Sequence, residues 1–129
     1  MRKKPYIIAE ACCNHMGDFE IALKMIEVAA ESNINAIKFQ KHNPKECLSE
    51  EQYNAPHPCE MNSFGASYGL HREYLEFTIE QHKKLQEECK KRGIEYSASV
   101  WDLTSAKEVS TLNPTYIKIP SAANLYMKI

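Results

Sequence analysis

The stretch Ala36-Ile37-Lys38-Phe39-Gln40 places a lysine in the middle of an apolar segment that has the length of a β-strand. Because side chains alternate along a strand, Lys38 and Gln40 share one face and the two large apolar side chains share the other. The pattern recurs at residues 116–120, around Lys118. An unpaired ammonium is costly to bury, so the two stretches indicate either edge strands guarded by lysine or a sheet face that opens onto an anion-binding cavity.

The residues before this stretch predict a strand, a helix and a second strand. Residues 6–11 are expected to form the first strand, with Glu10 near its carboxyl end. Asp18 is a good N-cap for the helix that follows, and Asn33 tolerates the left-handed backbone that ends many helices. Such a strand–helix–strand unit implies parallel strands and a right-handed connection.

Beyond residue 40 the pattern continues after one long interruption. Residues 41–72 are rich in proline and glycine and are predicted to be irregular, although residues 67–77 have the composition of a packed segment. Thr78 and Gln81 form a capping-box pattern for a helix that stops at Gly93. We then expect a strand at 95–100, a short helix at 104–111 and a strand at 116–119.

This order of elements predicts an α/β fold with parallel strands and crossover helices. Strands separated by about 30 residues suit either a doubly wound sheet or part of a TIM (β/α)8 barrel. Polar side chains at the carboxyl ends of all four strands favour the barrel, whose sites are built there. Since a whole barrel takes about 250 residues, the chain would form its first half, about four βα units.

Composition narrows the classes of partner. The 129 residues include 16 lysines and arginines and 17 aspartates and glutamates, so we expect neither nucleic acid nor an anionic membrane as a partner. Glu10 interrupts the first apolar run, which argues against a secretory signal peptide. Five cysteines without a CxxC pair suit free thiols in a reducing compartment, so a cytoplasmic location is expected.

Polar side chains gather near the predicted strand ends. Lysines act as point charges for anions and hydroxyl groups donate to oxygens, so the set suits a phosphorylated or carboxylated small molecule. For Ser97 and Ser99, filling a strand face as small residues is an equally good explanation. The residues are Glu10, Lys38, Gln40, Ser99, Lys118 and Ser121.

The loop after the first strand offers two further candidates, Asn14 and His15. They could position a substrate or bind a metal, but a histidine in a loop is more often a structural group. The two cysteines beside them lack the spacing of a closed zinc site, so no structural metal is expected. His71 and Arg72 suit either a pair that anchors the loop or a substrate contact.

Four segments resemble the sialic acid synthase (N-acetylneuraminate synthase) family. Residues 7–18 resemble its opening IIAEIGxNHxGD motif, and residues 36–40 resemble its second-strand AxKFQ. Residues 68–77 resemble its YGxHRxxLEF segment, and residues 116–121 resemble YKIPS. The four motifs occur in the same order as in the family, and the match runs from residue 5 to about residue 124.

The resemblance implies a TIM-barrel transferase that condenses phosphoenolpyruvate with an N-acyl amino sugar such as N-acetylmannosamine or its 6-phosphate. The product would be a nonulosonic acid such as N-acetylneuraminate, with phosphate released by C–O cleavage. It implies Glu10 as the catalytic carboxylate and Gln40 as a contact to the acceptor sugar. The remaining substrate-binding positions would be Lys38, Ser99, Lys118 and Ser121 for phosphoenolpyruvate, with Asn14 and His15 as further members of the motif.

The resemblance also implies features outside the 129 residues. A divalent metal, Mn²⁺ or Mg²⁺, would be held by ligands beyond residue 129, and the full-length enzyme would be a homodimer closed by a small antifreeze-like C-terminal domain. Residues 1–129 would then be the N-terminal part of the barrel and inactive alone. Many family members carry an acid where this sequence has Ala122-Ala123, which leaves open a related synthase for another phosphorylated sugar, or a non-catalytic anion-binding module.

Overall fold

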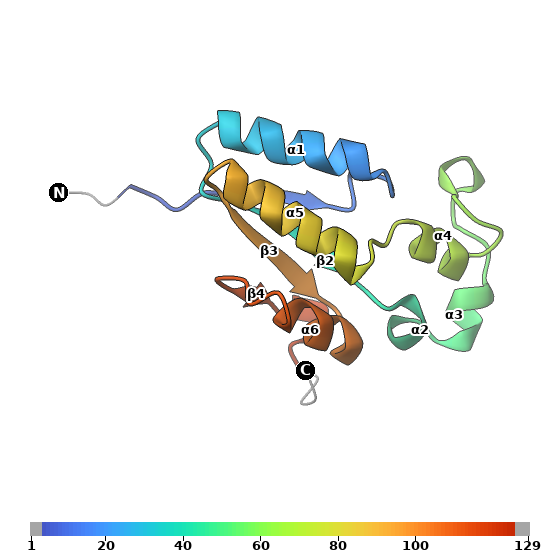
Figure 1. The fold of residues 1–129 in the computed structure, drawn as a ribbon. Helices are drawn as coiled ribbons and strands as arrows, with labels where there is room; N and C mark the ends of the chain where they lie inside the picture. Colours follow the sequence, from blue (N-terminus) through green and yellow to red (C-terminus); the bar gives the residue numbers. More distant parts are fainter. Residues whose placement is uncertain (1–3, 126–129) are drawn as a thin grey trace.

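The computed structural model describes residues 4–125, which form one parallel β-sheet covered by helices (Figure 1). The strands are β1 (Ile8–Cys12), β2 (Ala36–Lys41), β3 (Glu95–Val100) and β4 (Ile117–Lys118). The helices that connect them are α1 (Phe19–Glu31), α5 (Ile79–Lys91) and α6 (Leu103–Ser110). The predicted alternation of strands and helices is confirmed.

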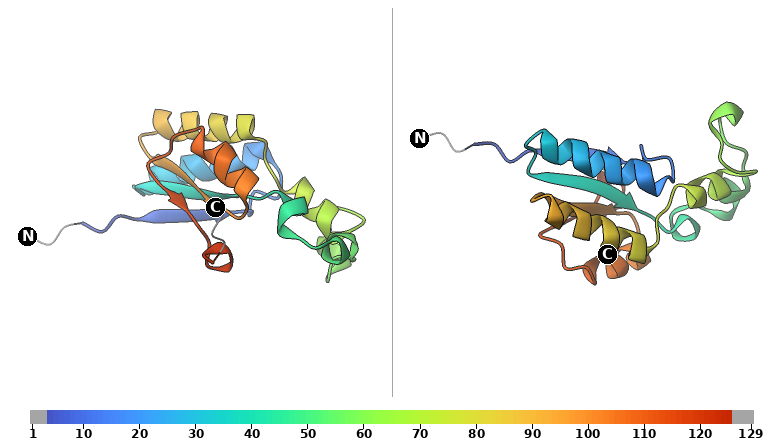
Figure 2. Two further views of the ribbon diagram at one scale, coloured as in Figure 1. Left: turned by 90° about the horizontal axis from the view of Figure 1, so that it is seen from below. Right: turned by 45° about the horizontal axis from the view of Figure 1, so that its top comes forward.

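The order of the strands distinguishes between a doubly wound sheet and part of a TIM barrel, the two architectures that suit the sequence. The strands lie in the sheet in the order of the sequence, and every neighbouring pair is parallel. Right-handed crossovers that step in one direction place their helices on one face, and α1, α5 and α6 form a single layer (Figures 1 and 2). A doubly wound sheet carries helices on both faces, so the barrel alternative is the one that fits.

The hydrophobic core lies between the sheet and this helix layer. Burial of a large apolar side chain contributes about 1.5–3 kcal/mol, so this interface is the main source of stability. Because two apolar residues of β2 point into it, alternation turns Lys38 and Gln40 to the opposite face. The buried side chains come from three strands and three helices and include Ala11, Ile26, Ile37, Phe39, Leu85, Tyr96, Ala98, Val100 and Val109.

The helix ends follow signals that are local in the sequence. The Asp18 carboxylate accepts hydrogen bonds from two backbone N–H groups at the start of α1. Thr78 and Gln81 form the predicted capping box of α5. Asn33 and Gly93, which follow the two helices, have positive φ angles of 55° and 75°. The predicted starts and stops of both long helices are therefore confirmed.

Residues 42–77 form an excursion of short helices at the carboxyl end of β2, where the sequence predicts an irregular segment. Gly69 lies against the ring of Tyr53, and an added Cβ would fall 2.2 Å from that ring. The Tyr53 hydroxyl donates to Glu73 (2.7 Å). Such contacts, rather than propensity, stabilise helices this short. The helices are α2 (Pro44–Cys47), α3 (Glu50–Asn54), the 3-10 helix η1 (Glu60–Asn62) and α4 (Tyr68–Tyr74).

The fourth strand is shorter than predicted. Ile117 and Lys118 pair with Ala98 and Ser99 of β3, whereas the sequence indicates residues 116–119. Pro120 lacks a backbone N–H group and cannot extend the ladder. The chain then turns into a 3-10 helix, η2 (Ser121–Ala123). Within residues 4–125 we find no helix with the length and apolar character needed to cross a bilayer.

Candidate functional site

Two rows of polar side chains cross the sheet on the face away from the helices. The register aligns Glu10 with Lys38, and Lys38 with Ser97. Two residues closer to the carboxyl ends of the strands, the register aligns Gln40 with Ser99, and Ser99 in turn pairs with Lys118. Paired residues of parallel strands project to the same face. The sheet therefore brings together five of the predicted site residues: Glu10, Lys38, Gln40, Ser99 and Lys118.

Lys38 occupies the interior of this face. β2 lies between β1 and β3, so the alternative that Lys38 guards an edge strand is wrong. Its side chain is 7% exposed and forms an ion pair with Glu10 (Nζ–Oε1 2.7 Å), whose own side chain is 54% exposed. The buried cation thus has the partner that burial requires, while the pair remains open to solvent at the Glu10 end. An ammonium has three donors, so Lys38 can hold Glu10 and an anion together.

The outer part of the face contains the second lysine and the serines. Lys118 is exposed on β4, the outermost strand of the described sheet, so both the edge-strand and the ligand alternatives fit it. Ser99, its partner in the register, is buried. Ser97 donates its hydroxyl to the carbonyl oxygen of Tyr116 (2.9 Å) and so has a structural partner. Ser121 starts η2 and is exposed beyond the end of β4.

Asn14 and His15 lie in the turn that follows β1, and their own contacts are to the backbone of that turn and to the core. Asn14 is exposed and donates through Nδ2 to the carbonyl oxygen of Ala11 (3.1 Å). His15 is buried and stacks on Phe77 of the core, with ring centroids 4.1 Å apart. Its Nδ1 accepts a hydrogen bond from the Gly17 backbone (3.1 Å), and burial lowers its pKa. These contacts are those of a structural histidine, and substrate binding by either residue stays a prediction.

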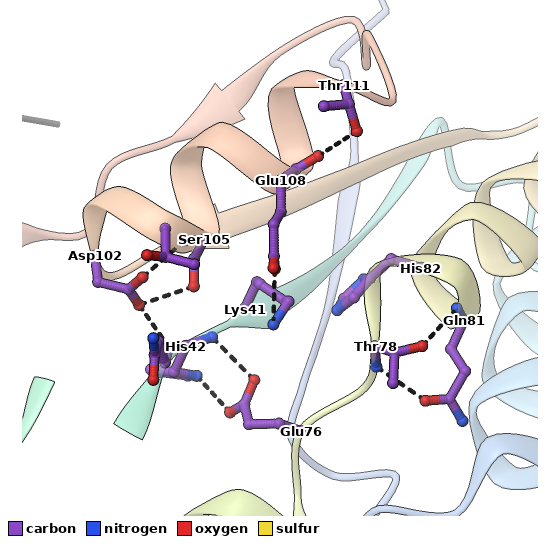
Figure 3. Close-up of polar contacts among 12 residues, drawn as sticks. Lys41, His42, Glu76, Thr78, Gln81, His82, Asp102, Ser105, Glu108 and Thr111 are labelled. Carbon is purple, nitrogen blue, oxygen red and sulfur yellow. Dashed lines mark hydrogen bonds and ion pairs between the residues drawn. The ribbon is translucent and has the colours of Figure 1, made fainter. Parts of the chain in front are cut away.

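A polar network that the sequence did not reveal lies beside the rows, at the carboxyl end of β2. His42 donates its backbone N–H to Glu76 (2.9 Å), and its Nδ1 lies 2.8 Å from the same carboxylate (Figure 3). The Arg72 Nη2 atom lies 3.7 Å from Glu76 Oε1 and 3.4 Å from His42 Nδ1. His71 instead accepts a hydrogen bond from the Phe64 backbone (3.2 Å). The loop-anchoring interpretation of residues 71 and 72 therefore fits the structure.

A second buried carboxylate ties this excursion to α6. Asp102 accepts hydrogen bonds from the backbone N–H and hydroxyl of Ser105 (2.7 and 2.8 Å) and from the Asn43 backbone (2.7 Å) (Figure 3). The Cys47 thiol donates to the same carboxylate (3.4 Å), and burial raises the pKa of Cys47 to about 12. Asp102 thus caps α6 and fixes the start of α2 in one position.

Three ligand-type side chains converge in the network: Cys13, His42 and Glu76. Their ligand atoms lie within 4.8 Å of one another, close enough to surround a cation. However, the Arg72 guanidinium already lies among them, with Nη2 3.9 Å from Cys13 Sγ. A metal ion would have to displace this positive charge. The geometry therefore describes a network held by an arginine and does not fit a metal centre.

Comparison with known protein families shows which family the chain belongs to. A family model described as the NeuB family matches residues 25–129. The chain belongs to the NeuB family. The resemblance to sialic acid synthases that the four sequence motifs indicate is thereby confirmed.

Relatives of this NeuB family chain are synthases of acidic sugars. It is 39% identical to N-acetylneuraminate-9-phosphate synthase of Drosophila melanogaster, over 90% of this chain and 31% of the relative. It is 36% identical to N,N'-diacetyllegionaminic acid synthase of Campylobacter jejuni, over 92% of this chain and 36% of the relative. The chain therefore spans about a third of the length of the curated relatives it matches.

A solved structure confirms the fold class. The N-acetylneuraminic acid (sialic acid) synthetase of Leptospira borgpetersenii, in complex with citrate, superposes with a TM-score of 0.74 at 29% identity. The match covers 94% of this chain and 38% of that one. Sialic acid synthetases are TIM-barrel enzymes, so the NeuB family chain has the architecture of the first βα units of such a barrel. The polar rows then lie on the face that lines a barrel's interior.

Proposed function

We propose that this NeuB family chain provides the phosphoenolpyruvate-binding part of a transferase that makes a nonulosonic acid such as N-acetylneuraminate. Its second substrate would be an N-acyl amino sugar of the N-acetylmannosamine type. The observation that carries the proposal is the register that aligns Ser99 with Lys118, one step along the same face from Lys38. Residues 1–129 would form the N-terminal part of the barrel domain, whose active site lies at the carboxyl ends of the strands.

The donor is a small polyanion, which explains the residue types on this face. Lys38 and Lys118 would supply positive charge to the phosphate and carboxylate, and Ser99 and Ser121 would donate from their hydroxyls. Gln40 lies on the same face and would contact the acceptor sugar. The ion pair with Glu10 would hold the buried Lys38 ammonium in place. Oxygen atoms of phosphoenolpyruvate would then take the place of the water molecules that this ammonium lost on burial.

The proposed reaction joins two carbon atoms and releases phosphate. C3 of phosphoenolpyruvate attacks the sugar aldehyde carbon, so a C–C bond forms and the aldehyde oxygen becomes a hydroxyl. Water adds to C2; the resulting C2 hydroxyl then becomes the ketone while the bond between C2 and the phosphate oxygen breaks, and the hydroxyl proton leaves with the phosphate. We assign Glu10 to accept a proton from this water, because its carboxylate is exposed beside the lysine that holds the donor. The proton that Glu10 accepts balances the proton that the sugar alkoxide takes up to become a hydroxyl.

A divalent cation, Mn²⁺ or Mg²⁺, would polarise the aldehyde oxygen in the complete enzyme. The described residues do not fit such a site, because Arg72 lies among the ligand-type side chains that converge there. We therefore place the metal ligands outside residues 4–125 and assign no step of this chain's chemistry to the metal. A homodimeric full-length enzyme and a cytoplasmic location complete the proposal. The five cysteines, all of them free, suit that location.

Binding of phosphoenolpyruvate tests the proposal directly. We expect phosphoenolpyruvate to raise the melting temperature of the chain in a saturable way. The affinity derived from this shift should be about tenfold weaker in Lys38→Met and in Lys118→Met, because each change removes a charge-assisted contact. Lys84→Met, an exposed lysine on α5, is the matched control and should leave the affinity unchanged. Equal affinity in the unmodified protein and both strand variants would favour a non-catalytic module.

A related synthase for another phosphorylated sugar is the second candidate. The absence of an acid at Ala122-Ala123, just beyond Ser121, is the observation that favours it. Assays of the full-length protein with phosphoenolpyruvate and either N-acyl mannosamines or aldose phosphates would separate the two. Turnover with aldose phosphates alone would establish the second candidate.

A further inference from the structure

Two histidine rings lie against each other in the 42–77 excursion. His71 belongs to α4 and is 8% exposed, and His57 lies between α3 and η1. Their ring centroids are 4.3 Å apart. Within residues 4–125 neither ring has a carboxylate oxygen within 4.0 Å, whereas His42 pairs with Glu76. The contact therefore joins two groups that can both become positively charged near neutral pH.

Only the neutral form of His71 fits its hydrogen bond. The backbone N–H of Phe64 donates to Nδ1 of His71 (3.2 Å). Because a backbone N–H cannot accept, a proton on this nitrogen would place two donors against each other. His57 differs, since its Nδ1 faces both the N–H (3.0 Å) and the carbonyl oxygen (2.7 Å) of Cys59. His57 thus has a partner in either protonation state, whereas protonation of His71 breaks its contact.

The acids on and around α4 have other partners or face solvent. Glu73 pairs with Lys45 of α2 (3.5 Å) and accepts a hydrogen bond from the Tyr53 hydroxyl of α3 (2.7 Å). Glu76 contacts His42 after β2. The other acids of α3 and η1 are exposed, and they are Glu50, Glu51 and Glu60. None of these carboxylates forms an ion pair with the α4 imidazole within the described part of the chain.

Burial and positive charge both oppose protonation of His71. Burial lowers its pKa, and His57, once it is protonated, and the Arg72 guanidinium act in the same direction. A histidine that is released from such packing titrates near pH 6.5. The packed arrangement therefore has its full stability above about pH 6.5 and loses stability as the pH falls below that value.

The two rings belong to the contacts that close the excursion on itself. Phe64 stacks on both His71 and Tyr74, with ring centroids 5.6 and 4.8 Å apart. The Tyr68 backbone N–H donates to the carbonyl oxygen of Ala55 (2.7 Å), which joins the two ends of the intervening loop. Figure 1 shows that this part of the chain projects beyond the carboxyl end of β2. Its packing therefore depends on contacts within the excursion.

The excursion also contacts the sheet beside the candidate site. Arg72, which follows His71 in α4, lies 3.4 Å from His42 Nδ1, and Glu76 accepts the His42 backbone N–H (2.9 Å). Gln40 of the second polar row lies two residues before His42. A change in the packing of His71 thus occurs next to a residue that contacts the end of β2.

We propose that His57 and His71 form a pH switch that keeps the 42–77 excursion packed at neutral pH and opens residues 55–71 in mild acid. His71 takes a proton from solvent on Nδ1, and its hydrogen bond with the Phe64 backbone breaks. The two charged rings then repel each other, and the loop that packs around them separates from α4. The switch belongs to the excursion itself and does not depend on the proposed synthase function.

Hydrogen–deuterium exchange of the chain at pH 7.5, 6.5 and 5.5 measures this opening. Exchange in each peptide is corrected for the intrinsic rate at that pH. Protection of peptides from residues 55–71 should fall about fivefold between pH 6.5 and 5.5, because one histidine that titrates near 6.5 only in the open state shifts the equilibrium by about that factor. Peptides from α5 in the same samples report unfolding of the whole domain.

Three asparagine variants separate the switch from other effects of pH. In His71→Asn the side-chain oxygen can still accept from the Phe64 N–H but does not titrate, so the fivefold loss should disappear. His57→Asn removes the second charge and should make the loss smaller. His82→Asn, a histidine of the core, is the matched control and should keep the loss over residues 55–71. Protection of α5 at pH 7.5 checks that each variant is folded.

Several outcomes would overturn the switch. Equal protection of residues 55–71 at pH 6.5 and 5.5 in the unmodified protein would do so, as would a fivefold loss that persists in folded His71→Asn. An equal loss in His57→Asn would exclude a contribution from the second ring and refute the paired switch. Titration of the His71 ring by NMR in the unmodified protein needs no variant. We expect a pKa below 6.5, and a value of 6.5 or above would refute the proposal.

Discussion

The buried histidine of α5 makes the stability of the fold depend on pH in a way that can be calculated. His82 has no exposed surface, and its Nδ1 is hydrogen-bonded to the Tyr96 hydroxyl (2.8 Å). Nε2 has no partner within residues 4–125. Burial lowers the pKa of His82 to about 3, and the positive charge of Lys41 acts in the same direction. Protonation would place a charge in the apolar layer between sheet and helices.

The sign of the effect follows from the two pKa values. In the unfolded chain a histidine titrates near 6.5, whereas in the folded chain His82 stays neutral down to about pH 3. The stability that comes from keeping His82 neutral is therefore fully present above about pH 6.5 and is lost as the pH falls toward 3. Each pH unit in this interval costs about 1.4 kcal/mol, so lowering the pH from 6.5 to 5 should cost about 2 kcal/mol.

Urea denaturation followed by circular dichroism at pH 7, 6 and 5 measures this loss. In His82→Asn the titrating ring is absent, and the amide can still form a hydrogen bond with the Tyr96 hydroxyl. The free energy of unfolding of this variant should therefore fall by about 2 kcal/mol less over the same pH range. Leu85→Ala, on the same helix, should cost about 2–5 kcal/mol at every pH and keep the slope of the unmodified protein. Parallel pH curves for the unmodified protein and His82→Asn would refute the reasoning.

Three further predictions concern the local devices of the fold. Gly69→Ala should destabilise the 42–77 excursion, although alanine favours helices by about 1 kcal/mol, because the new Cβ meets the Tyr53 ring; limited proteolysis should show earlier cleavage there, and unchanged cleavage would contradict this. Asp18→Ala should cost about 1 kcal/mol in urea unfolding through loss of the α1 N-cap, and no change in midpoint would be inconsistent with the cap. Asp102→Ala should cost at least as much as Asp18→Ala, because it leaves buried donors on Asn43 and Ser105 unpaired; a smaller cost would mean that those donors find other partners.

The elements of the fold could be predicted because their signals are local. The alternation around Lys38, the Asp18 cap, the capping box at Thr78 and the turn at Asn33 each involve residues at most four apart. Hydrogen bonds and side-chain alternation over that distance do not depend on the rest of the chain. The short helices of residues 42–77 were missed because their stability comes from packing, as between Gly69 and Tyr53.

The sequence by itself thus determined the strands, the long helices, the family resemblance and the face that carries the lysines. Only the tertiary structure decided which contacts these side chains make. It placed Lys38 on an interior strand with Glu10 as its partner, buried His15 against Phe77, and brought Arg72 beside His42 and Cys13. The physical reason is that such contacts join residues 28 or more positions apart, and their geometry depends on sheet order and on the path of the excursion.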